Sequence, residues 1–472
     1  MHKLKLYFIL LLLLPLSTLG QGLPLIQSYK ATKYGGGVQN WDIYIDKSNI
    51  VYFSHNEGVT TFDGKKWEHF RNSNISHIRC MSMGAGNRLY AGGYFEFGYF
   101  EPNILGKLEY TSLMDRFVDT SLQFTYVWSV AATSSNTVFT IRDQVLLYDM
   151  DSIKVIKSNC KLSRVFNIFD NTILFSRGEG ILKLSGTEFT PLPGLDMFKD
   201  DTYVLITEFS DNQILLCSEL SGIWIYNYGA ALTNQKQPYL RRIETNIEEE
   251  ISSELLSDIE YDSLRNTIHI CTMTTLYSID TLGITKSILG FEQVIVGKYA
   301  ISIKCDRLGN VWVGTGNGVS YVHMASPLRF IDNRLGNPEH PYDILFNSDY
   351  SYLSTMGGLS IIKTEDLLKS PAKPLTEMIS DQIGGWEIHN LDNRIITSVG
   401  YKIIEIVADK VKTKLSKVDA YSITNYSKKD QILFLGGVDN SYLLDMKNKN
   451  RTTKMENLAG SVKRAVAVGE YH

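Results

Sequence analysis

The chain repeats one short pattern roughly every 42 residues, and this repeat restricts its fold more than any other feature. In each copy a glycine followed by an apolar residue opens a short strand-like run. Six copies keep this glycine, and two longer intervals each contain a variant copy without it, at residues 144–149 and 275–280. The glycines are Gly58, Gly98, Gly180, Gly222, Gly318 and Gly358. Spacing of this kind is typical of an array of equal structural units.

Each unit has the same interior, and no helical period interrupts it. Two β-rich runs are separated by a turn, as at 46–49 and 306–310, and a glycine-led run and a more polar fourth run follow. A single four-stranded sheet cannot bury both of its faces, whereas sheets packed radially bury each face against a neighbour. The pattern therefore predicts an all-β protein built from propeller blades. A series of β-sandwiches is the rival interpretation, but it would not keep one spacing for so long.

Counting the units predicts two rings. Seven units fit into residues 21–326, and further units begin near Tyr342, Trp386 and Tyr421, with Val462–Val468 as the first strand of one more. The first seven are expected to start near Trp41, Ile78, Val127, Val165, Tyr203, Ser257 and Tyr299. We expect a seven-bladed β-propeller over 21–326, followed by an incomplete second propeller over 327–472 with three blades and one strand. Residues 23–29 are expected to form the outer strand that closes blade seven, and the similar segment 327–331 to begin the same task for the second ring.

The first 20 residues have the pattern of a secretory signal peptide. A basic start (Lys3, Lys5) precedes an apolar run of about 11 residues, and Thr18 and Gly20 are small residues suited to cleavage before Gln21. The alternative is an uncleaved anchor, but the run is short for a membrane helix, and no later apolar run reaches the length of a span. We expect a periplasmic or secreted protein, anchored in the inner membrane only if the gene continues.

Composition adds limits on partners. The formal charge is −4 and the pI is about 6.2, so there is no basic field to hold nucleic acid. The five cysteines are too few for a disulfide framework, and we expect buried thiols. The nine histidines lack metal-ligand spacing and no nucleotide-binding or nucleophile motif occurs, so we expect no metal, cofactor or catalytic residue.

Several motifs resemble one known family. The stretch 306–319, DRLGNVWVGTGNGV, resembles the repeat of the two-component regulator propeller family, whose consensus runs D-x-x-G-N-[IL]-W-[IV]-G-T-x-x-G-L. Residues 39–41, 51–59, 62–67 and 90–99 are similar to the opening of the sensor region in bacterial regulators of that group. The resemblance covers residues 21–472, strongly in units one, two and seven and loosely elsewhere.

The resemblance implies a periplasmic sensor. In that family two seven-bladed propellers precede a triple-tyrosine domain, a membrane helix and an output domain, and this sequence contains only the propeller portion. The implied function is ligand sensing without an output domain of its own. A protein partner, or a missing C-terminal portion, would then complete the second ring.

The loops between the second and third strands of the blades are the expected ligand site, because in a propeller they gather on one face around the central channel. These loops, with one innermost strand, carry aromatic residues and charges of both signs, which suit a polar or carbohydrate-like ligand. The candidates are Glu57, Tyr94, Glu96, Trp128, Arg142, Arg177, Glu179 and Glu219. The other interpretation of each residue is a solvated loop side chain.

Two other functions stay open. A polysaccharide hydrolase or lyase would need two carboxylates about 5–10 Å apart in the funnel, for which Glu57, Glu96, Glu179 and Glu219 are available. A scaffold would bind a protein through the open edge near 462–472. The acidic segment 243–256 is interpreted as a solvated insertion with one or two helical turns rather than a cation site.

Overall fold

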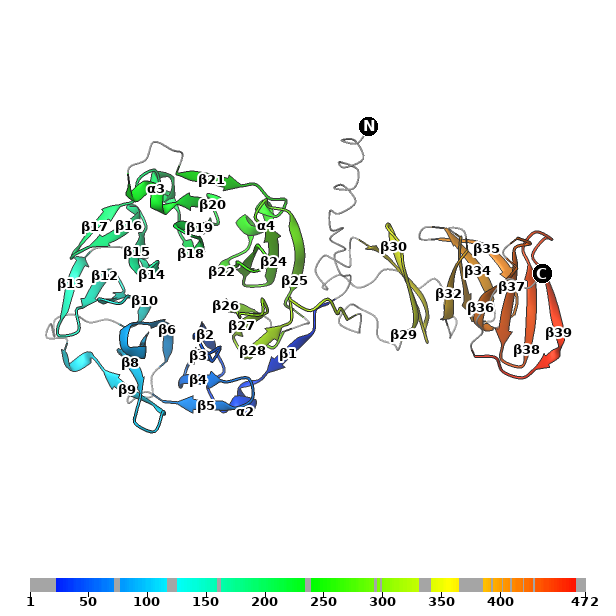
Figure 1. The fold of residues 1–472 in the computed structure, drawn as a ribbon, viewed down its shortest axis with the longest axis horizontal. Coiled ribbons are helices and arrows are strands. Elements are labelled where there is room, and N and C mark those ends of the chain that lie inside the picture. Colours follow the sequence, from blue (N-terminus) through cyan, green and yellow to red (C-terminus); the bar gives the residue numbers. More distant parts are fainter. Residues whose placement is uncertain are drawn as a thin grey trace, which may run out of the picture. The chain divides into compact units, whose positions relative to one another are not determined.

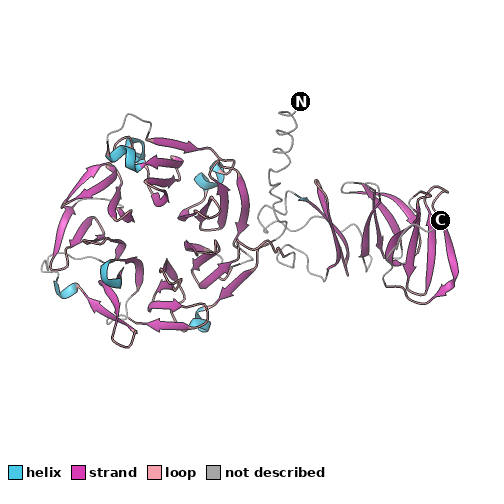
Figure 2. Cartoon of the chain, in the orientation of Figure 1, coloured by secondary structure: helices cyan, strands magenta, loops and turns pink. Residues whose placement is uncertain are grey.

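The computed structural model describes residues 23–463, except for 72–76, 117–124, 159–162, 234–238, 293–294, 298, 331–340, 365–384, 392–393, 401, 408–409, 419 and 428. The predicted signal peptide, Cys160 and the predicted strand from residue 464 onward therefore lie outside the described residues. The described chain is almost entirely β-structure with a few short helices (Figure 2). It divides into two compact units, Pro24–Leu328 and a second one from Arg329 onward together with Leu23.

Seven four-stranded antiparallel sheets make up the first unit, and we call them blades one to seven in chain order. Blades one to three are β2 (Asn40–Ile45), β3 (Val51–His55), β4 (Gly58–Phe62), β5 (Trp67–Phe70); β6 (Ile78–Met83), β7 (Leu89–Gly93), β8 (Phe97–Pro102), β9 (Leu108–Ser112); and β10 (Val127–Ala132), β11 (Thr137–Ile141), β12 (Gln144–Tyr148), β13 (Ile153–Ser158).

Blades four to six continue the same order. Their strands are β14 (Arg164–Ile168), β15 (Asn171–Ser176), β16 (Gly180–Ser185), β17 (Glu188–Pro191); β18 (Val204–Ser210), β19 (Gln213–Ser218), β20 (Gly222–Asn227), β21 (Leu240–Ile243); and β22 (Leu256–Asp262), β23 (Thr267–Thr272), β24 (Thr275–Asp280), β25 (Thr285–Gly290). The helices are α2 (Ala31–Tyr34), α3 (Tyr228–Leu232) and α4 (Glu248–Ser253), with 3₁₀ turns η1 (Ala85–Asn87), η2 (Met114–Arg116) and η3 (Asp196–Asp200).

Blade seven joins the two ends of the unit. It combines β26 (Ala300–Cys305), β27 (Val311–Thr315) and β28 (Gly318–Val322) with β1 (Ile26–Tyr29), which pairs antiparallel with β28. The expected outer strand from residues 23–29 is thus confirmed. The first strands of adjacent blades contact one another around the whole series, including β26 with β2, so the sheets form a closed ring (Figure 1).

An aromatic cluster seals this closure. Trp312 of blade seven packs against Phe53 of blade one, with ring centroids 5.2 Å apart, and Trp67 lies 5.2 Å from Tyr29 of β1. Trp312 is only 4% exposed. The all-β propeller class predicted from the repeat is confirmed, and each first strand of the ring begins within one residue of its predicted start.

The second unit contains three antiparallel sheets. They are β29 (Pro341–Phe346), β30 (Tyr350–Thr355), β31 (Gly358–Lys363); β32 (Gly385–Leu391), β33 (Arg394–Val399), β34 (Ile403–Val407), β35 (Lys410–Ser416); and β36 (Ala420–Ser427), β37 (Ile432–Gly437), β38 (Asn440–Asp445), β39 (Arg451–Ala459). Their first strands pack in series, β29 on β32 and β32 on β36. Whether these sheets belong to a second ring stays a prediction.

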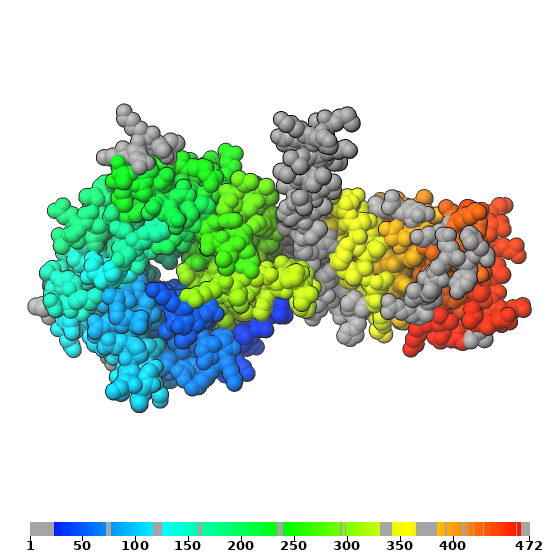
Figure 3. Space-filling view, viewed as in Figure 1, coloured from blue at the N-terminus to red at the C-terminus, as the bar shows by residue number. Residues whose placement is uncertain are grey.

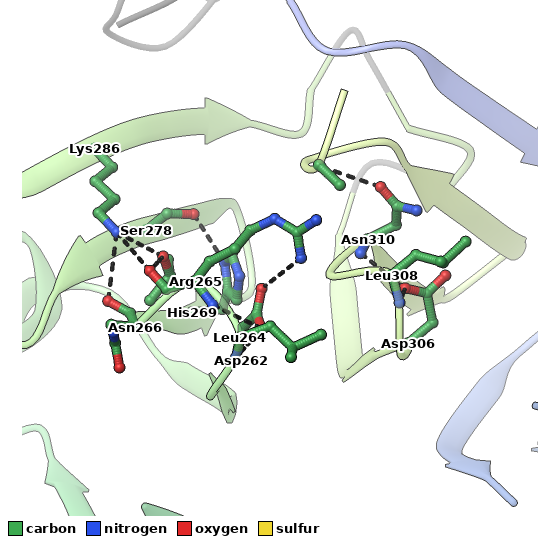
Figure 4. Close-up of polar contacts among 12 residues, drawn as sticks. Asp262, Leu264, Arg265, Asn266, His269, Ser278, Lys286, Asp306, Leu308 and Asn310 are labelled. Carbon is green, nitrogen blue, oxygen red and sulfur yellow. Dashed lines mark hydrogen bonds and ion pairs between the residues drawn. The ribbon is translucent and has the colours of Figure 1, made fainter. Parts of the chain in front are cut away.

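The family-like motif of blade seven folds as a turn (Figure 4). The Asp306 carboxylate accepts hydrogen bonds from the backbone N–H groups of Leu308 (2.8 Å) and Asn310 (2.9 Å). Gly309 has a φ of +77°, which favours glycine at this position. Asp262 does the same in blade six, accepting from Leu264 N–H at 3.0 Å. The first five residues of the motif therefore fix the turn between the first two strands of blade seven.

The cysteines are free thiols within the described chain. Cys80, Cys217 and Cys271 are buried and Cys305 is partly buried, and none of these four forms a disulfide. Burial raises the pKa of the Cys217 thiol to about 12. The acidic segment contains α4, as expected, but it is only partly solvated. Ile251 is buried, and Glu254 accepts a hydrogen bond from Tyr277 at 3.1 Å.

Candidate functional site

The innermost strand of most blades carries a β-bulge at its second residue. Pairing between the first and second strands shifts register across this residue, which leaves its side chain free of the regular alternation. In the ring the bulged residues are Trp41, Arg79, Trp128, Ser257 and Ile301. These positions begin the strands that surround the central opening, which remains when all atoms are drawn (Figures 1 and 3). Blades one to three therefore present two indoles and a guanidinium there.

The guanidinium of Arg79 is stacked among three aromatic rings. Its Cζ atom lies 4.0 Å from the ring centroid of Tyr126, 4.3 Å from that of Trp41 and 5.1 Å from that of Trp128. Burial lowers the pKa of the Arg79 guanidinium from its ordinary value. Asn56, in the loop after β3, accepts a hydrogen bond from Trp41 Nε1 at 2.8 Å and fixes that indole. The cation of blade two is thus held by the faces of three rings from blades one and three.

The stack continues into an exposed aromatic surface. Tyr94 lies 5.1 Å from Tyr126 and 4.4 Å from Phe95, measured between ring centroids. Trp128 is 52% exposed, Phe95 52% and Tyr94 39%. Phe95 also has a φ of +50°, a conformation that costs energy for a bulky residue and tends to occur at functional sites. We call Trp41, Arg79, Tyr94, Phe95, Tyr126 and Trp128 the aromatic mouth.

Charged side chains from different blades interact below the mouth. Asp42, Arg164 and Asp258 occupy the innermost strands of blades one, four and six, and the charge of Arg164 opposes a rise in the pKa of both carboxyls. Burial raises the pKa of the Asp42 carboxyl to about 6, with a contribution from Asp258, while Arg164 and Lys304 oppose the rise. Burial also raises the pKa of Asp258. Lys304 forms an ion pair with Glu260 at 2.5 Å.

The two carboxylates with raised pKa are already engaged in hydrogen bonds. Each accepts one N–H from the next residue of its own strand and one from the innermost strand of the following blade. We call this second hydrogen bond the inter-blade latch, and Ser129 makes it with a hydroxyl. The latches are Asp42 Oδ2 to Met81 N–H (2.7 Å), Ser129 Oγ to Val165 N–H (2.9 Å) and Asp258 Oδ2 to Ile303 N–H (2.9 Å).

The structure brings together two of the eight predicted site residues, Tyr94 and Trp128, in the aromatic mouth. Arg142 and Arg177 lie exposed in separate turns of blades three and four. Glu57 pairs with Arg71 at 3.6 Å and Glu179 with Lys157 at 2.7 Å, while Glu219 accepts the N–H of Leu256 at 3.0 Å. These residues remain predictions as ligand contacts, but they do not form one cluster with the mouth.

Glu96 lies elsewhere than the loop pattern suggested. It is fully buried, and its Oε1 accepts hydrogen bonds from Ser112 Oγ (2.7 Å) and Tyr110 OH (3.1 Å) on β9. The carboxylate satisfies two hydroxyls inside blade two, so the residue does not line the funnel surface. The short strand pairing of Gly92 with Phe97 turns this side chain inward, which the loop position alone does not reveal.

The eight candidates from the sequence do not include Trp41, Arg79 and Tyr126, nor Phe95, although Phe95 lies in one of the loops expected to form the site. Three of the mouth residues occupy the same position in successive repeats, the second residue of the first strand. Aligning that position across the repeats would have found Trp41 and Arg79 beside Trp128. Tyr126 precedes its strand, and only its pairing with Tyr94 places it there.

A cleft of about 590 Å³ lies at the opposite ends of these strands, among the turns between first and second strands. Its lining includes Tyr44, Tyr52 and Asp46, and the Asp46 carboxylate is occupied by turn N–H groups and by Tyr52 OH. None of the predicted residues lines it. In the described part of the chain no group of three or more His, Cys, Asp or Glu side chains is placed to hold a metal ion.

Comparisons with known proteins give similarity of structure only. No protein-family model and no curated protein matches the sequence. The chain is similar to the extracellular domain of a putative hybrid two-component system from B. thetaiotaomicron, with 12% identity and a TM-score of 0.47 over 91% of this chain and 60% of that one. This is the class of protein that the sequence motifs resemble.

Two single-ring structures are similar as well. The WD40 β-propeller domain of Doa1 has 13% identity and a TM-score of 0.47, covering 65% of this chain and 99% of that one. Virginiamycin B lyase from Staphylococcus aureus has 10% identity and a TM-score of 0.47, covering 63% of this chain and 98% of that one. Such similarities assign no activity. Separately, no helix in the described ranges is long and apolar enough to cross a membrane.

Proposed function

We propose that this chain is an exported, non-enzymatic sensor propeller that binds a polar, carbohydrate-like ligand at the aromatic mouth. Its site of action would be the periplasm or the cell exterior, as the N-terminal signal pattern predicts. Residues 341–459 would supply blades of a second ring. Residues 21–326 would be the ring that holds the ligand.

One observation carries the proposal. Trp128 is 52% exposed although it lies on an innermost strand, and it packs at 5.6 Å from Tyr126 and beside the Arg79 guanidinium. Leaving a large indole in water costs free energy that burial would recover. A sugar ring presents an apolar face to such an indole and hydroxyl groups to neighbouring polar atoms. The mixture of flat rings and a cation supports binding of a polar, ring-shaped ligand.

The environments of the candidate carboxylates support binding rather than hydrolysis. The four acids available for a catalytic pair lie in four different blades, and each has the partner described above. Asp42 and Asp258 are closer to the axis, but their oxygens accept backbone N–H groups that join blades. A general acid needs an oxygen directed at the substrate. A polysaccharide hydrolase or lyase therefore remains the second candidate.

A binding screen tests this function. The chain from Gln21 onward is applied to an array of oligosaccharides, and each positive is titrated by calorimetry. Trp128→Ala is expected to weaken binding at least about tenfold, because it removes the apolar area that the ring buries and about 0.5–1.5 kcal/mol of stacking. The matched control is Tyr426→Ala, which removes a 61% exposed aromatic ring outside the mouth. If no oligosaccharide binds, or if both variants bind as the parent does, the proposal is wrong.

A further inference from the structure

The charge of Arg79 has no counter-ion among the described residues. The groups that influence its titration are Tyr126 and Cys80, and no carboxylate is among them. The nearest predicted acids are engaged elsewhere, Glu57 with Arg71 and Glu96 inside blade two. A partly buried cation without a carboxylate is unusual, because desolvation of the charge is normally offset by an ion pair.

A donor of Arg79 is also left unused. The Nε atom is buried and has no hydrogen-bond acceptor, and no described residue accepts a hydrogen bond from the guanidinium. The three aromatic rings contact the cation through their faces, and stacking of this kind leaves the N–H groups at the edge of the guanidinium free. Those N–H groups form the planar donor set that pairs with the oxygens of a carboxylate or sulfate.

Two other stacked arginines of the ring differ from Arg79, because each has a carboxylate partner. Arg88 lies 4.6 Å from the Tyr99 ring and donates to Glu101 Oε2 at 2.9 Å. Arg242 lies 5.9 Å from the Trp224 ring and pairs with Glu248, also at 2.9 Å. Both side chains combine an aromatic face with a carboxylate. Arg79 has the aromatic faces but lacks the anion.

We infer that the ligand supplies this anion: the Arg79 guanidinium binds a carboxylate or sulfate group carried by a saccharide, so the aromatic mouth selects acidic over neutral sugars. This inference rests on the proposed function and narrows its ligand class. Trp128 and Tyr94 supply the stacking surface for the sugar ring, and the free edge of Arg79 supplies the charge-assisted hydrogen bonds. The rings exclude water from one side of the cation and strengthen those bonds.

The test uses the full exported chain and saccharides in matched pairs. Each neutral oligosaccharide is compared with a uronic acid counterpart and with a sulfated counterpart, and each uronic acid with its methyl ester. Binding is measured by calorimetry for the parent chain, Arg79→Met, Arg79→Lys and Arg88→Met. The methionine keeps an apolar stem between the rings but removes the charge.

We expect acidic members to bind and their neutral or esterified partners to bind at least about tenfold more weakly. Arg79→Met is expected to lose about 10- to 100-fold in affinity, Arg79→Lys to recover part of it, and Arg88→Met to bind as the parent does. Arg79→Met is also expected to unfold at a temperature equal to or above that of the parent, because it removes an unpaired cation. If Arg79 had only a structural role, Arg79→Met would instead lower the unfolding temperature.

The outcomes separate two failures. If neutral saccharides bind as well as acidic ones, or if Arg79→Met binds an acidic saccharide normally, the inference about charge is wrong while the proposed function stands. If no saccharide of either kind binds, the proposed function and the inference both fail. Binding of uronic acids alone or of sulfated sugars alone identifies the source of the anion.

Discussion

The first strands of the ring and those of the second unit share one backbone design but differ in the side chains it presents. In both units the strand bulges at its second residue, which is Trp41, Arg79 and Trp128 in blades one to three and Tyr342, Trp386 and Tyr421 in the three sheets of the second unit. In the second unit these residues form an aromatic row. Trp386 lies 4.8 Å from Tyr342 and 4.5 Å from Tyr421. The middle residue of the three is thus a cation in the ring, Arg79, and an indole in the second unit, Trp386.

The inter-blade latch is shared as well. Asp343 Oδ2 accepts the N–H of Ile388 at 2.7 Å, and Glu387 Oε2 accepts the N–H of Ile423 at 2.5 Å. These contacts match the Asp42 latch of the ring in position and length. The bulge and the latch therefore recur in both units, although not in every blade, and we call them the constant part. The bulged side chain is the variable part, and function is expected to depend on it.

The largest expected effect comes from breaking the constant part in each unit. Asp42→Ala and Asp343→Ala each leave a strand N–H without its acceptor, which costs about 1–3 kcal/mol. Unfolding is followed by calorimetry at pH 5, where the Asp42 carboxyl is mostly neutral and its charge contributes little. We expect the two substitutions to lower the free energy of unfolding of their units by similar amounts.

Asp42→Asn and Asp343→Asn are the controls, since each amide keeps an acceptor oxygen. A loss confined to one unit would show that the latch is not a common device. No loss in either unit would show that water replaces the carboxylate at little cost.

A second, smaller effect follows from ring closure, which places Asp42 near Asp258, Arg164 and Lys304 of other blades. The pKa of Asp42 is about 6 in the folded chain, above the value near 3.9 of an unfolded chain. The folded state thus binds more protons between these values, and this group's contribution to stability falls as pH rises from 4 through 6. Asp42→Asn removes that dependence.

We therefore expect the free energy of unfolding of Asp42→Asn to rise by about 2 kcal/mol relative to that of the parent between pH 4 and pH 8. The free energies of unfolding of both proteins are measured in denaturant at the two pH values, and the difference between the proteins is compared. A difference that does not vary with pH, or that changes in favour of the parent, contradicts the raised pKa. Ser129→Ala, which removes a latch without a titrating group, should show no such change.

Much of the fold follows from the sequence because the repeat has a direct physical cause. The four-stranded order and the turn between the first two strands recur from blade to blade, so the spacing survives even where the glycine of the third strand is missing. The blade starts and the closing strand β1 were therefore predictable. The site was harder to predict. A loop position does not say whether Glu96 points inward, and Arg79 becomes conspicuous only when two separate segments supply three rings around it.

The smallest expected effect tests whether the cation alone distinguishes the two units. Trp386→Arg places a guanidinium between Tyr342 and Tyr421, at the position that Arg79 holds in the ring. Trp386 is partly exposed. Its indole N–H donates no hydrogen bond to any described residue, so the substitution breaks none. Its replacement exchanges two ring–ring contacts for two cation–ring contacts of similar strength, and should therefore change the free energy of unfolding by less than about 1 kcal/mol.

We combine Trp386→Arg with Arg79→Met in one chain. The double variant is expected not to bind acidic saccharides. The row offers flanking rings to the cation, but it lacks the third ring that Tyr126 adds and the exposed indole of Trp128. Calorimetric titration with the best acidic saccharide measures this directly. Recovery of affinity to within tenfold of the parent would show that a stacked cation is sufficient and that the rest of the aromatic mouth is dispensable. Continued absence of binding would place the specificity in the whole set of mouth residues, with Arg79 as its charged member.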